Sequence, residues 1–311
     1  MTVAVYVAMY AGALLFLVGC LKRIYQYART PLHLRWELYP VPHEEPDRAR
    51  YGGSYFESGE WWLSPQAVHH RGDWTAMFRE IVFLRGLWEF NPRLWLPSFL
   101  FHFGLYLSIV TAGLAIAGAA FGALIPGVVA GRMTADAFVI AGWTGATGIL
   151  LVLAGSIWLL IRRATDATLK NYTKAGDIFN LTFFIAAFAC LAYGFLGSTV
   201  NGASFEEIAR GALRFDRGTH VGATAGLGLI LVSALAAYIP FTHMSHFIAK
   251  YFTWHSVRWD DRRNARDGIV ESKVAVSLRN RPTWAAAHVG ADGKKSWAEI
   301  ASANPAEEVR K

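Results

Sequence analysis

The chain has 311 residues, of which 54% are hydrophobic, and a formal net charge of +7. A positive balance can indicate a nucleic-acid partner, but here the basic residues flank long apolar blocks, where anionic lipid accounts for them. The sequence therefore predicts a membrane protein with no nucleic-acid partner. Its two cysteines, Cys20 and Cys190, fall in different blocks without a Cys-rich run. This excludes an iron–sulfur cluster held by this chain alone.

Five blocks of the sequence contain no Asp, Glu, Lys or Arg, and they span residues 3–21, 94–131, 137–161, 178–205 and 218–249. Each reaches about the 20 residues that an α-helix needs to cross a hydrocarbon core about 30 Å thick. The first block has no basic residue before it and no small-residue cleavage site before the basic pair at 22–23. We therefore expect an all-α membrane protein, a bundle of five transmembrane helices whose first helix is retained.

The basic residues are distributed unequally between the connections of these blocks. Segments 22–93, 162–174 and 250–311 hold 10, 4 and 12 of the 30 basic residues, and the other side has only four. Because Lys and Arg near helix ends resist translocation, this asymmetry places the N-terminus outside and the C-terminus in the cytoplasm of a bacterial or archaeal inner membrane. The predicted organisation is a membrane domain at 1–255, with a cytoplasmic loop at 22–93, and a cytoplasmic arm at 256–311.

Aromatic residues concentrate in the loop and recur in the arm. Trp88 and Trp95 lie just before the second block and are typical of an aromatic belt at the membrane surface. The others lie too far from a block to be simple anchors, and we interpret them as contacts for a protein partner: Trp36, Tyr39, Trp61 and Trp62. The arm, with Trp284 and Trp297, is predicted to extend along a partner, with disorder as the alternative.

Histidines inside the apolar blocks are the main functional signal, because ionisable or metal-binding groups are costly in a bilayer. His102 lies in the second block, about two turns past Arg93, and His246 lies in the fifth block just before Lys250. Since these two helices run in opposite directions, both imidazoles should lie at similar depth near the cytoplasmic face. Such a pair is the usual axial ligand set of a haem b, and Gly104 and Gly113 could let the flat macrocycle approach. The alternative is that both histidines are structural.

Four short motifs, in this order, carry a resemblance to a known family. They are YAGALLFLVG at 10–19, LFHFG at 100–104, KAGDI at 174–178, and the Pro-Phe pair at 240–241 followed by His246. Their order, spacing and topology make the chain resemble the gamma subunit of respiratory nitrate reductase, a five-helix membrane cytochrome b. The resemblance covers most of the membrane region. It extends to the cytochrome subunits that accompany heterodisulfide reductase-like iron–sulfur proteins, which the long aromatic loop and the extended tail fit better.

The resemblance implies the electron-transfer subunit of a quinone-linked oxidoreductase of a respiratory chain. It would relay electrons between the quinone or menaquinone pool and a cytoplasmic iron–sulfur partner, through a haem b held by His102 and His246. No substrate chemistry beyond the quinone is expected on this chain. His243 is an alternative ligand, and Arg93, Lys250 or Lys174 could pair with the haem propionates.

The chain departs from this family at the positions of a second haem. Family members hold that haem near the outer face with two further histidines, and the corresponding positions here are Ala112 and Gly228. The resemblance therefore implies one haem, with two as the alternative. His220 is the histidine left on the outer side. Together with Asp216 and Arg217 it could bind a quinone carbonyl or take up a quinol proton, because an imidazole titrates near neutral pH. The alternative is that all three hydrate the outer loop.

The remaining histidines lie in cytoplasmic segments, and we interpret them as surface or interface residues: His33, His43, His69, His70, His255 and His288. Two rival functions are left open. In a proton or solute transporter subunit, the membrane histidines would line a transport path, although such proteins usually carry buried carboxylates in the middle of broken helices. In a haem-free anchor, the chain would only tether its partners to the membrane.

Overall fold

The computed structural model describes residues 1–29, 42, 44, 46–51, 54–65, 69–125, 128–197, 202–257, 265–284 and 290–304. Several aromatic and histidine residues that the sequence analysis interpreted as interface or surface residues lie outside these ranges: Trp36, Tyr39, His33, His43 and His288. The side chain of His255 is also outside the description. The chain divides into two compact units. The first comprises Met1–Cys20 and Ala76–Met244, and the second comprises Leu21–Thr75 and Ser245–Lys311.

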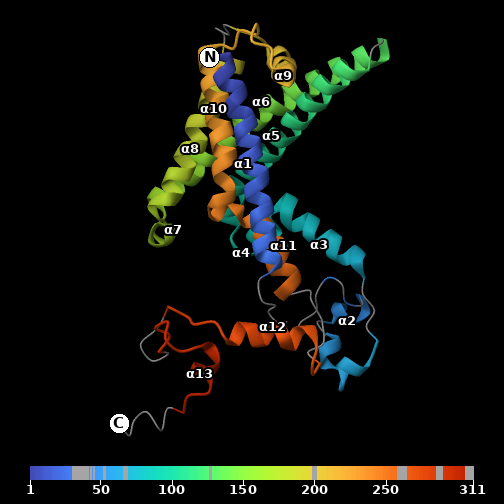
Figure 1. The fold of residues 1–311 in the computed structure, drawn as a ribbon, viewed down its shortest axis with the longest axis vertical. Helices are drawn as coiled ribbons and strands as arrows, with labels where there is room; N and C mark the ends of the chain where they lie inside the picture. The colour runs from blue at the N-terminus through green and yellow to red at the C-terminus, as the bar shows by residue number, and fades with distance from the viewer. Residues whose placement is uncertain are drawn as a thin grey trace. The chain divides into compact units, whose positions relative to one another are not determined.

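The described residues form helices and no strands, and five helical segments are long and apolar enough to cross a membrane. This confirms the predicted all-helical class and the five apolar helices. The segments are α1 (Thr2–Ala28), α5 (Pro92–Leu124), most of α6 (Val128–Thr165), α8 (Ala175–Leu191) continued by the π-helix η3 (Ala192–Leu196), and α10 (Ala223–Tyr238) continued by the 3₁₀-helix η4 (Ile239–Phe241) (Figure 1). Insertion into a membrane and the orientation of the termini remain predictions.

The fifth apolar block is not one helix. After η4 the backbone is extended at Thr242, and a second 3₁₀-helix, η5 (His243–Ser245), leads into α11 (His246–Val257). Pro240 explains the interruption, because it has no N–H to donate and its ring clashes with a continuing helix. The expected helix over 218–249 therefore ends before His243 and His246, which lie on separate elements.

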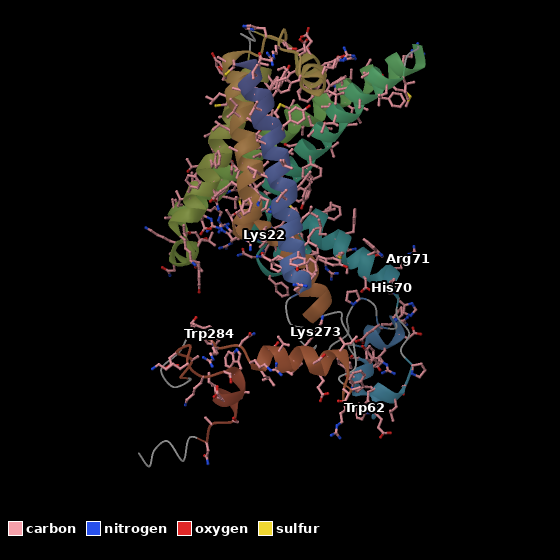
Figure 2. All side chains as sticks on the ribbon, in the orientation of Figure 1. Lys22, Trp62, His70, Arg71, Lys273 and Trp284 are labelled. Carbon is pink, nitrogen blue, oxygen red and sulfur yellow. The ribbon has the colours of Figure 1, made fainter. Side chains whose placement is uncertain are left out.

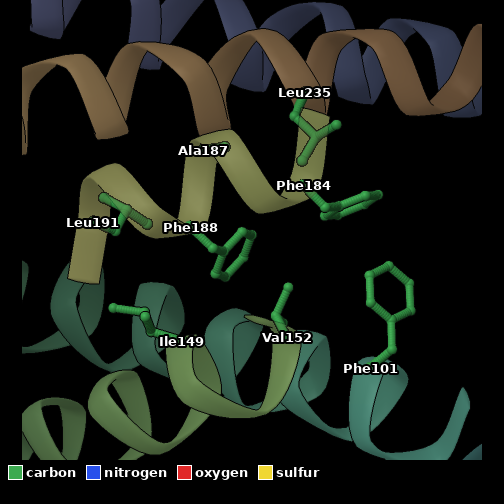
Figure 3. Close-up of a cluster of buried hydrophobic side chains, with 8 residues drawn as sticks. All are labelled: Phe101, Ile149, Val152, Phe184, Ala187, Phe188, Leu191 and Leu235. Atoms are coloured by element: carbon green, nitrogen blue, oxygen red, sulfur yellow. The ribbon is translucent and has the colours of Figure 1, made fainter. Parts of the chain in front are cut away.

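The apolar core of the first unit lies between α5, α6, α8 and α10. Figure 3 shows Val152 of α6 pointing toward Phe184 and Phe188 of α8, with Phe101 of α5 beside them. The rings of Phe101 and Phe184 meet edge to face, with centroids 4.8 Å apart. This core fixes the position of α5, and with it the residue that follows Phe101.

Glycines allow the helices of the first unit to pack closely. A Cβ added to Gly155 of α6 would lie 2.5 Å from the backbone nitrogen of Phe101, and one added to Gly12 of α1 would lie 2.5 Å from the carbonyl oxygen of Ser233 on α10. Small residues at such contacts are typical of membrane helices, whose association depends on van der Waals packing. The α5–α6 pair and the α1–α10 pair are therefore held at backbone-to-backbone distance.

Four shorter helices complete the first unit or lead into it. They are α3 (His70–Phe83), α4 (Arg85–Phe90), α7 (Ala167–Tyr172) and α9 (Phe205–Arg214). α9 begins with a capping box, in which the hydroxyl of Ser204 accepts the backbone N–H of Glu207 and the Glu207 carboxylate accepts the N–H of Ser204. Its apolar face packs on the end of α5 and the beginning of α6, around Phe138.

The second unit contains α2 (Pro46–Arg50), the 3₁₀-helices η1 (Tyr55–Glu57) and η2 (Trp61–Leu63), α11, α12 (Ile269–Leu278) and α13 (Trp297–Ala301). In the loop, the ring of Trp61 contacts that of Phe56 with centroids 4.4 Å apart, and the neighbouring Trp62 is exposed (Figure 2). In the arm, the rings of Trp284 and Trp297 lie 5.7 Å apart, so these two residues are not isolated. The backbone N–H of Trp297 also donates to the carbonyl of Asn280, and this hydrogen bond brings these two positions of the arm together.

Candidate functional site

His102 lies on α5, half-buried, with its ring edge against Phe101 at a centroid distance of 5.3 Å. Its Nδ1 is 2.7 Å from the carbonyl oxygen of Ser98, one turn earlier. Because a carbonyl only accepts, Nδ1 must carry the proton, and the lone pair of the neutral ring is then on Nε2. Histidines that bind metals in proteins usually donate their other N–H in this way, which fixes the tautomer and orients the ring. His102 therefore fits a haem-iron ligand.

Gly104 does not serve the role expected from the sequence. A Cβ at this position would lie 2.7 Å from the backbone nitrogen of Val152 and 2.9 Å from the carbonyl oxygen of Gly148, both on α6. The absent side chain is thus required for contact between α5 and α6, which leaves no room there for a macrocycle. At Gly113, by contrast, a Cβ would meet no atom of the described residues within 4 Å.

His246 is the first residue of α11 and is exposed, and Lys250 follows on the same helix. Both belong to the second unit, whereas His102 belongs to the first. That His102 and His246 share one iron therefore stays a prediction, as does pairing of Lys250 with a propionate. Arg93 lies in the first turn of α5, and its backbone carbonyl accepts a hydrogen bond of 2.7 Å from Nη1 of Arg162.

His243 lies in a polar cluster with residues of α8 and α10. Its Nε2 is 3.4 Å from Oδ1 of Asp177 and 3.5 Å from Nδ2 of Asn180, a residue that is only 5% exposed. The hydroxyl of Tyr238 donates to Oδ1 of Asn180 at 3.0 Å, and Arg163 of α6 lies 3.5 Å from the Asp177 carboxylate. An iron bound to Nε2 of His243 would have to displace both of its partners, so the cluster favours His246 as the ligand.

Replacing Asp177 by alanine is expected to lower the free energy of unfolding by about 1–2 kcal/mol. The carboxylate accepts the backbone N–H of Lys174 at 2.9 Å, which caps α8, and it also contacts Arg163 and His243. Denaturation with sodium dodecyl sulfate in detergent micelles would measure the change. Asp136→Ala, at an exposed position of α6, is the control and should change the value by less than about 0.5 kcal/mol. Equal effects of the two substitutions would contradict a stabilising role for the cluster.

The basic turn between α6 and α8 is organised by Asp166, the N-cap of α7. Its Oδ1 accepts the backbone N–H groups of Thr168 and Leu169, and its Oδ2 lies 2.5 Å from Nη2 of Arg162. The hydrogen bond from Arg162 contributes most to lowering the pKa of the Asp166 carboxyl below its ordinary value. The hydrogen bond from the Leu169 backbone N–H contributes next. The turn is therefore built around a carboxylate that stays ionised to unusually low pH.

This lowered pKa makes the stability of the turn depend on pH in one direction. The Asp166 carboxylate stabilises the folded state fully above the ordinary aspartate pKa of about 4. This stabilisation is lost as the pH falls through the lower pKa that Asp166 has in the folded state. We expect the unfolding temperature of the wild type to fall more steeply below about pH 4 than that of Asp166→Asn, which has no carboxylate to protonate. Thermal unfolding measured across this pH range would check the prediction, and parallel curves for the two proteins would contradict it.

An open pocket of about 530 Å³ lies between α9 and the loop that precedes α10. This volume is within the range typical of small-molecule sites. Two of the three residues predicted for a quinone site, His220 and Asp216, line it, whereas Arg217 does not. The backbone N–H of Ala203 donates to the carbonyl of His220 at 2.7 Å and closes one edge of the pocket. Gly202 lies at the same edge, where its φ of 139° favours glycine.

The pocket also contains charged residues of α9 that the sequence reasoning did not select: Glu207, Arg210 and Arg214. The backbone N–H and the hydroxyl of Ser204 donate to the Glu207 carboxylate, and the backbone bond has the larger effect. Both lower the pKa of Glu207, which favours the negatively charged form of this side chain. Arg210 is paired with Glu206 at 2.7 Å and lies over the ring of Phe138. The i,i+4 spacing of Glu206 and Arg210 was a visible signal of this pair. The sequence did not indicate that Arg210 lines the same pocket as His220, because this depends on how α9 folds back.

The wall of the pocket touches a buried tyrosine. Tyr6 of α1 has no exposed surface, and its hydroxyl bonds to no group among the described residues. A Cβ added to Gly211, which lines the pocket, would collide with this hydroxyl and with Thr219. Tyr6 itself does not line the pocket, and its hydroxyl lies behind Gly211.

The two positions corresponding to the ligands of a second haem are occupied differently. Ala112 is exposed on α5. Gly228 is buried in α10, where an added Cβ would lie 2.8 Å from the backbone nitrogen of Leu191 on α8. The Gly228 position therefore cannot hold an imidazole without separating these two helices.

Comparison with known proteins adds no family to this description: no family model matches the chain, and no curated protein sequence matches it.

Proposed function

We propose that this chain is a haem b-containing membrane subunit of a respiratory oxidoreductase. It would relay electrons between the membrane quinone pool and a cytoplasmic iron–sulfur subunit, for which heterodisulfide reductase-like proteins are the expected class. The observation that carries the proposal is the geometry of His102 on an apolar helix. Its Nδ1–H is committed to the Ser98 carbonyl, which leaves the lone pair on Nε2.

The hydrogen bond from Nδ1 to the Ser98 carbonyl sets the tautomer of the neutral His102 ring, and a haem-ligating histidine needs this tautomer. Nε2 is the nitrogen that a metal usually takes when Nδ1 donates to a carbonyl. Bound between His102 and His246, a haem b would supply one-electron transfer. His102 and His246 would be its protein ligands, and apolar helices would exclude water from it.

The quinone headgroup is assigned to the pocket between α9 and the loop before α10. His220 and Asp216 are proton acceptors at its surface, and Arg210 and Arg214 supply positive charge for the oxygen that becomes anionic when a quinol loses its proton. His220 would therefore take up the proton that quinol oxidation releases.

A difference spectrum of the purified full-length protein tests the proposal. Dithionite-reduced minus oxidised protein should give the α band of a b-type cytochrome, and a pyridine haemochrome assay should give one haem per chain. Addition of a soluble quinol analogue in place of dithionite should produce the same band. A folded chain from haem-sufficient cells without such a band would overturn the proposal and favour an anchor or a transporter subunit.

A further inference from the structure

Residues 76–90 of the first unit comprise the end of α3 and all of α4, and α4 packs against α5. Two side chains of α5 bond to the backbone of this segment. The hydroxyl of Tyr106 donates to the carbonyl of Ile81 at 2.8 Å, and Nε1 of Trp95 donates to the carbonyl of Phe83 at 2.7 Å. Both carbonyls belong to the last turn of α3, whose carbonyls have no partner within their own helix. The end of α3 is therefore completed by α5.

The beginning of α4 is completed in a similar way. Leu84 separates the two helices in a left-handed conformation with φ of 51°, and the Glu80 carboxylate accepts the backbone N–H of Gly86 at 2.8 Å. In water, these end groups could bond to solvent at little cost. In hydrocarbon they cannot, and a break between helices is tolerated there only where other protein groups satisfy the backbone. The hydrogen bonding of this turn is of the kind that a turn inside a membrane requires.

The depth of the contact supports the same conclusion. Tyr106 lies twelve residues after Leu94, where the second apolar block begins, and twelve residues of helix rise about 18 Å. Helical side chains lean toward the N-terminus, so the Tyr106 hydroxyl lies somewhat closer to the start of α5 than its Cα does. The contact with Ile81 therefore falls beside the apolar part of α5, and the contact between Trp95 and Phe83 falls near the start of that part.

The outer surface of the segment carries large apolar side chains together with exposed charged ones at Arg79, Arg85 and Glu89. Five large side chains are between 46% and 87% exposed: Phe78, Ile81, Phe83, Trp88 and Phe90. α5 also has exposed apolar side chains, among them Leu96 and Ile109. Arg85 pairs with Glu89 at 2.5 Å, and the Glu80 carboxylate accepts the backbone N–H of Gly86. Arg79 has a stem long enough to reach the membrane surface.

We propose that residues 76–90 form a re-entrant hairpin, which enters the leaflet around the first half of α5 and contacts lipid acyl chains with its exposed apolar surface. This changes the expected location of a segment that charge distribution assigned to the cytoplasm. The hairpin also bounds the face of α5 that carries His102. Trp95, His102 and Tyr106 are spaced i, i+7 and i+11, which places them on one side of a helix. The inference does not depend on whether His102 binds haem.

Site-directed spin labelling of the full-length protein in lipid nanodiscs tests the proposal. With Cys20 and Cys190 replaced by alanine, a single cysteine is introduced by Phe78→Cys, Ile81→Cys or Trp88→Cys and labelled with a nitroxide. Each label should collide more often with oxygen, which concentrates in lipid, than with a water-soluble nickel chelate. Ile109→Cys on α5 provides the lipid reference, and Lys170→Cys on α7 provides the water reference.

Two outcomes would overturn the proposal. Labels as accessible to the nickel chelate as the Lys170→Cys label would place the segment in water, and labels shielded from both reagents would place it under protein. A second variant separates a specific position from general loss of structure. Adding Tyr106→Phe to Ile81→Cys removes the hydrogen bond between the Tyr106 hydroxyl and the Ile81 carbonyl. This should raise the collision rate of the label at position 81 with the nickel chelate several-fold. The same substitution added to Ile109→Cys should leave that label unchanged. No rise at Ile81 would show that Tyr106 does not hold the hairpin in lipid.

Discussion

Replacing Gly155 by alanine is expected to lower the free energy of unfolding by about 2–3 kcal/mol, the upper part of the range for overpacking. The new methyl group would lie 2.5 Å from the backbone nitrogen of Phe101 and 2.7 Å from its Cα. Backbone cannot rotate away as a side chain can, so α5 and α6 must separate along the contact that holds the first unit together. Denaturation in detergent micelles, followed by circular dichroism, would measure the loss.

Gly142 provides a matched control on the same helix. A Cβ at this position meets no described atom within 4 Å, so Gly142→Ala should be neutral or should stabilise α6 by up to about 1 kcal/mol through helix propensity. The two variants make the same chemical change in α6 and differ in what the methyl group meets. Equal stability of the two proteins would contradict the proposed role of Gly155 in helix packing.

Replacing His102 by alanine is expected to abolish the b-type absorption band and to reduce the haem content to background. If His102 and His246 are the haem ligands, as proposed, removal of His102 would leave the iron without one of its two protein ligands. The same result is expected for His246→Ala. His243→Ala should retain the band, because His243 is engaged by Asp177 and Asn180. Visible spectra and haemochrome assays of the purified variants would measure these effects.

Loss of haem can also follow from misfolding, so the His102 variant needs a chemical rescue. Imidazole added to His102→Ala during haem reconstitution should restore a low-spin band, since the free ligand can occupy the vacated position. An unaltered band in His102→Ala would refute the assignment of this ligand. Loss of the band in His243→Ala with retention in His246→Ala would exchange the roles of those two histidines.

The sequence predicted the number and class of the apolar helices because their signal is local. A run of about 20 residues without charge has few alternatives to a spanning helix. The ends of these helices were less predictable. The fourth ends at Leu196 and the fifth at Phe241, both inside their uncharged blocks, because the absence of charge does not mark where a helix stops. Pro240 was the visible signal for the second of these ends.

The candidate site was predictable only in part. His102 could be found because histidines are rare in apolar helices, but the bond from its Nδ1 to Ser98 depends on the rotamer of the ring. The partners of His243, Asp177 and Asn180, lie on α8, far from it in the sequence, and no local pattern joins Asp177 to Tyr238. Residues 76–90 were assigned to the cytoplasm because they are too short and too charged for a span. Their bonds to Trp95 and Tyr106 become visible only in three dimensions.

The length of α5 and α6 has a mechanical consequence. At 33 and 38 residues they are about 50 Å and 57 Å long, whereas a hydrocarbon core is about 30 Å thick. Leu124 and Met133, near the connection between them, are exposed apolar residues that water would not favour. Figure 1 shows the pair leaning away from α10. In a bilayer this lean would increase as the lipid chains shorten, so membrane thickness would set the angle at which α5 presents His102.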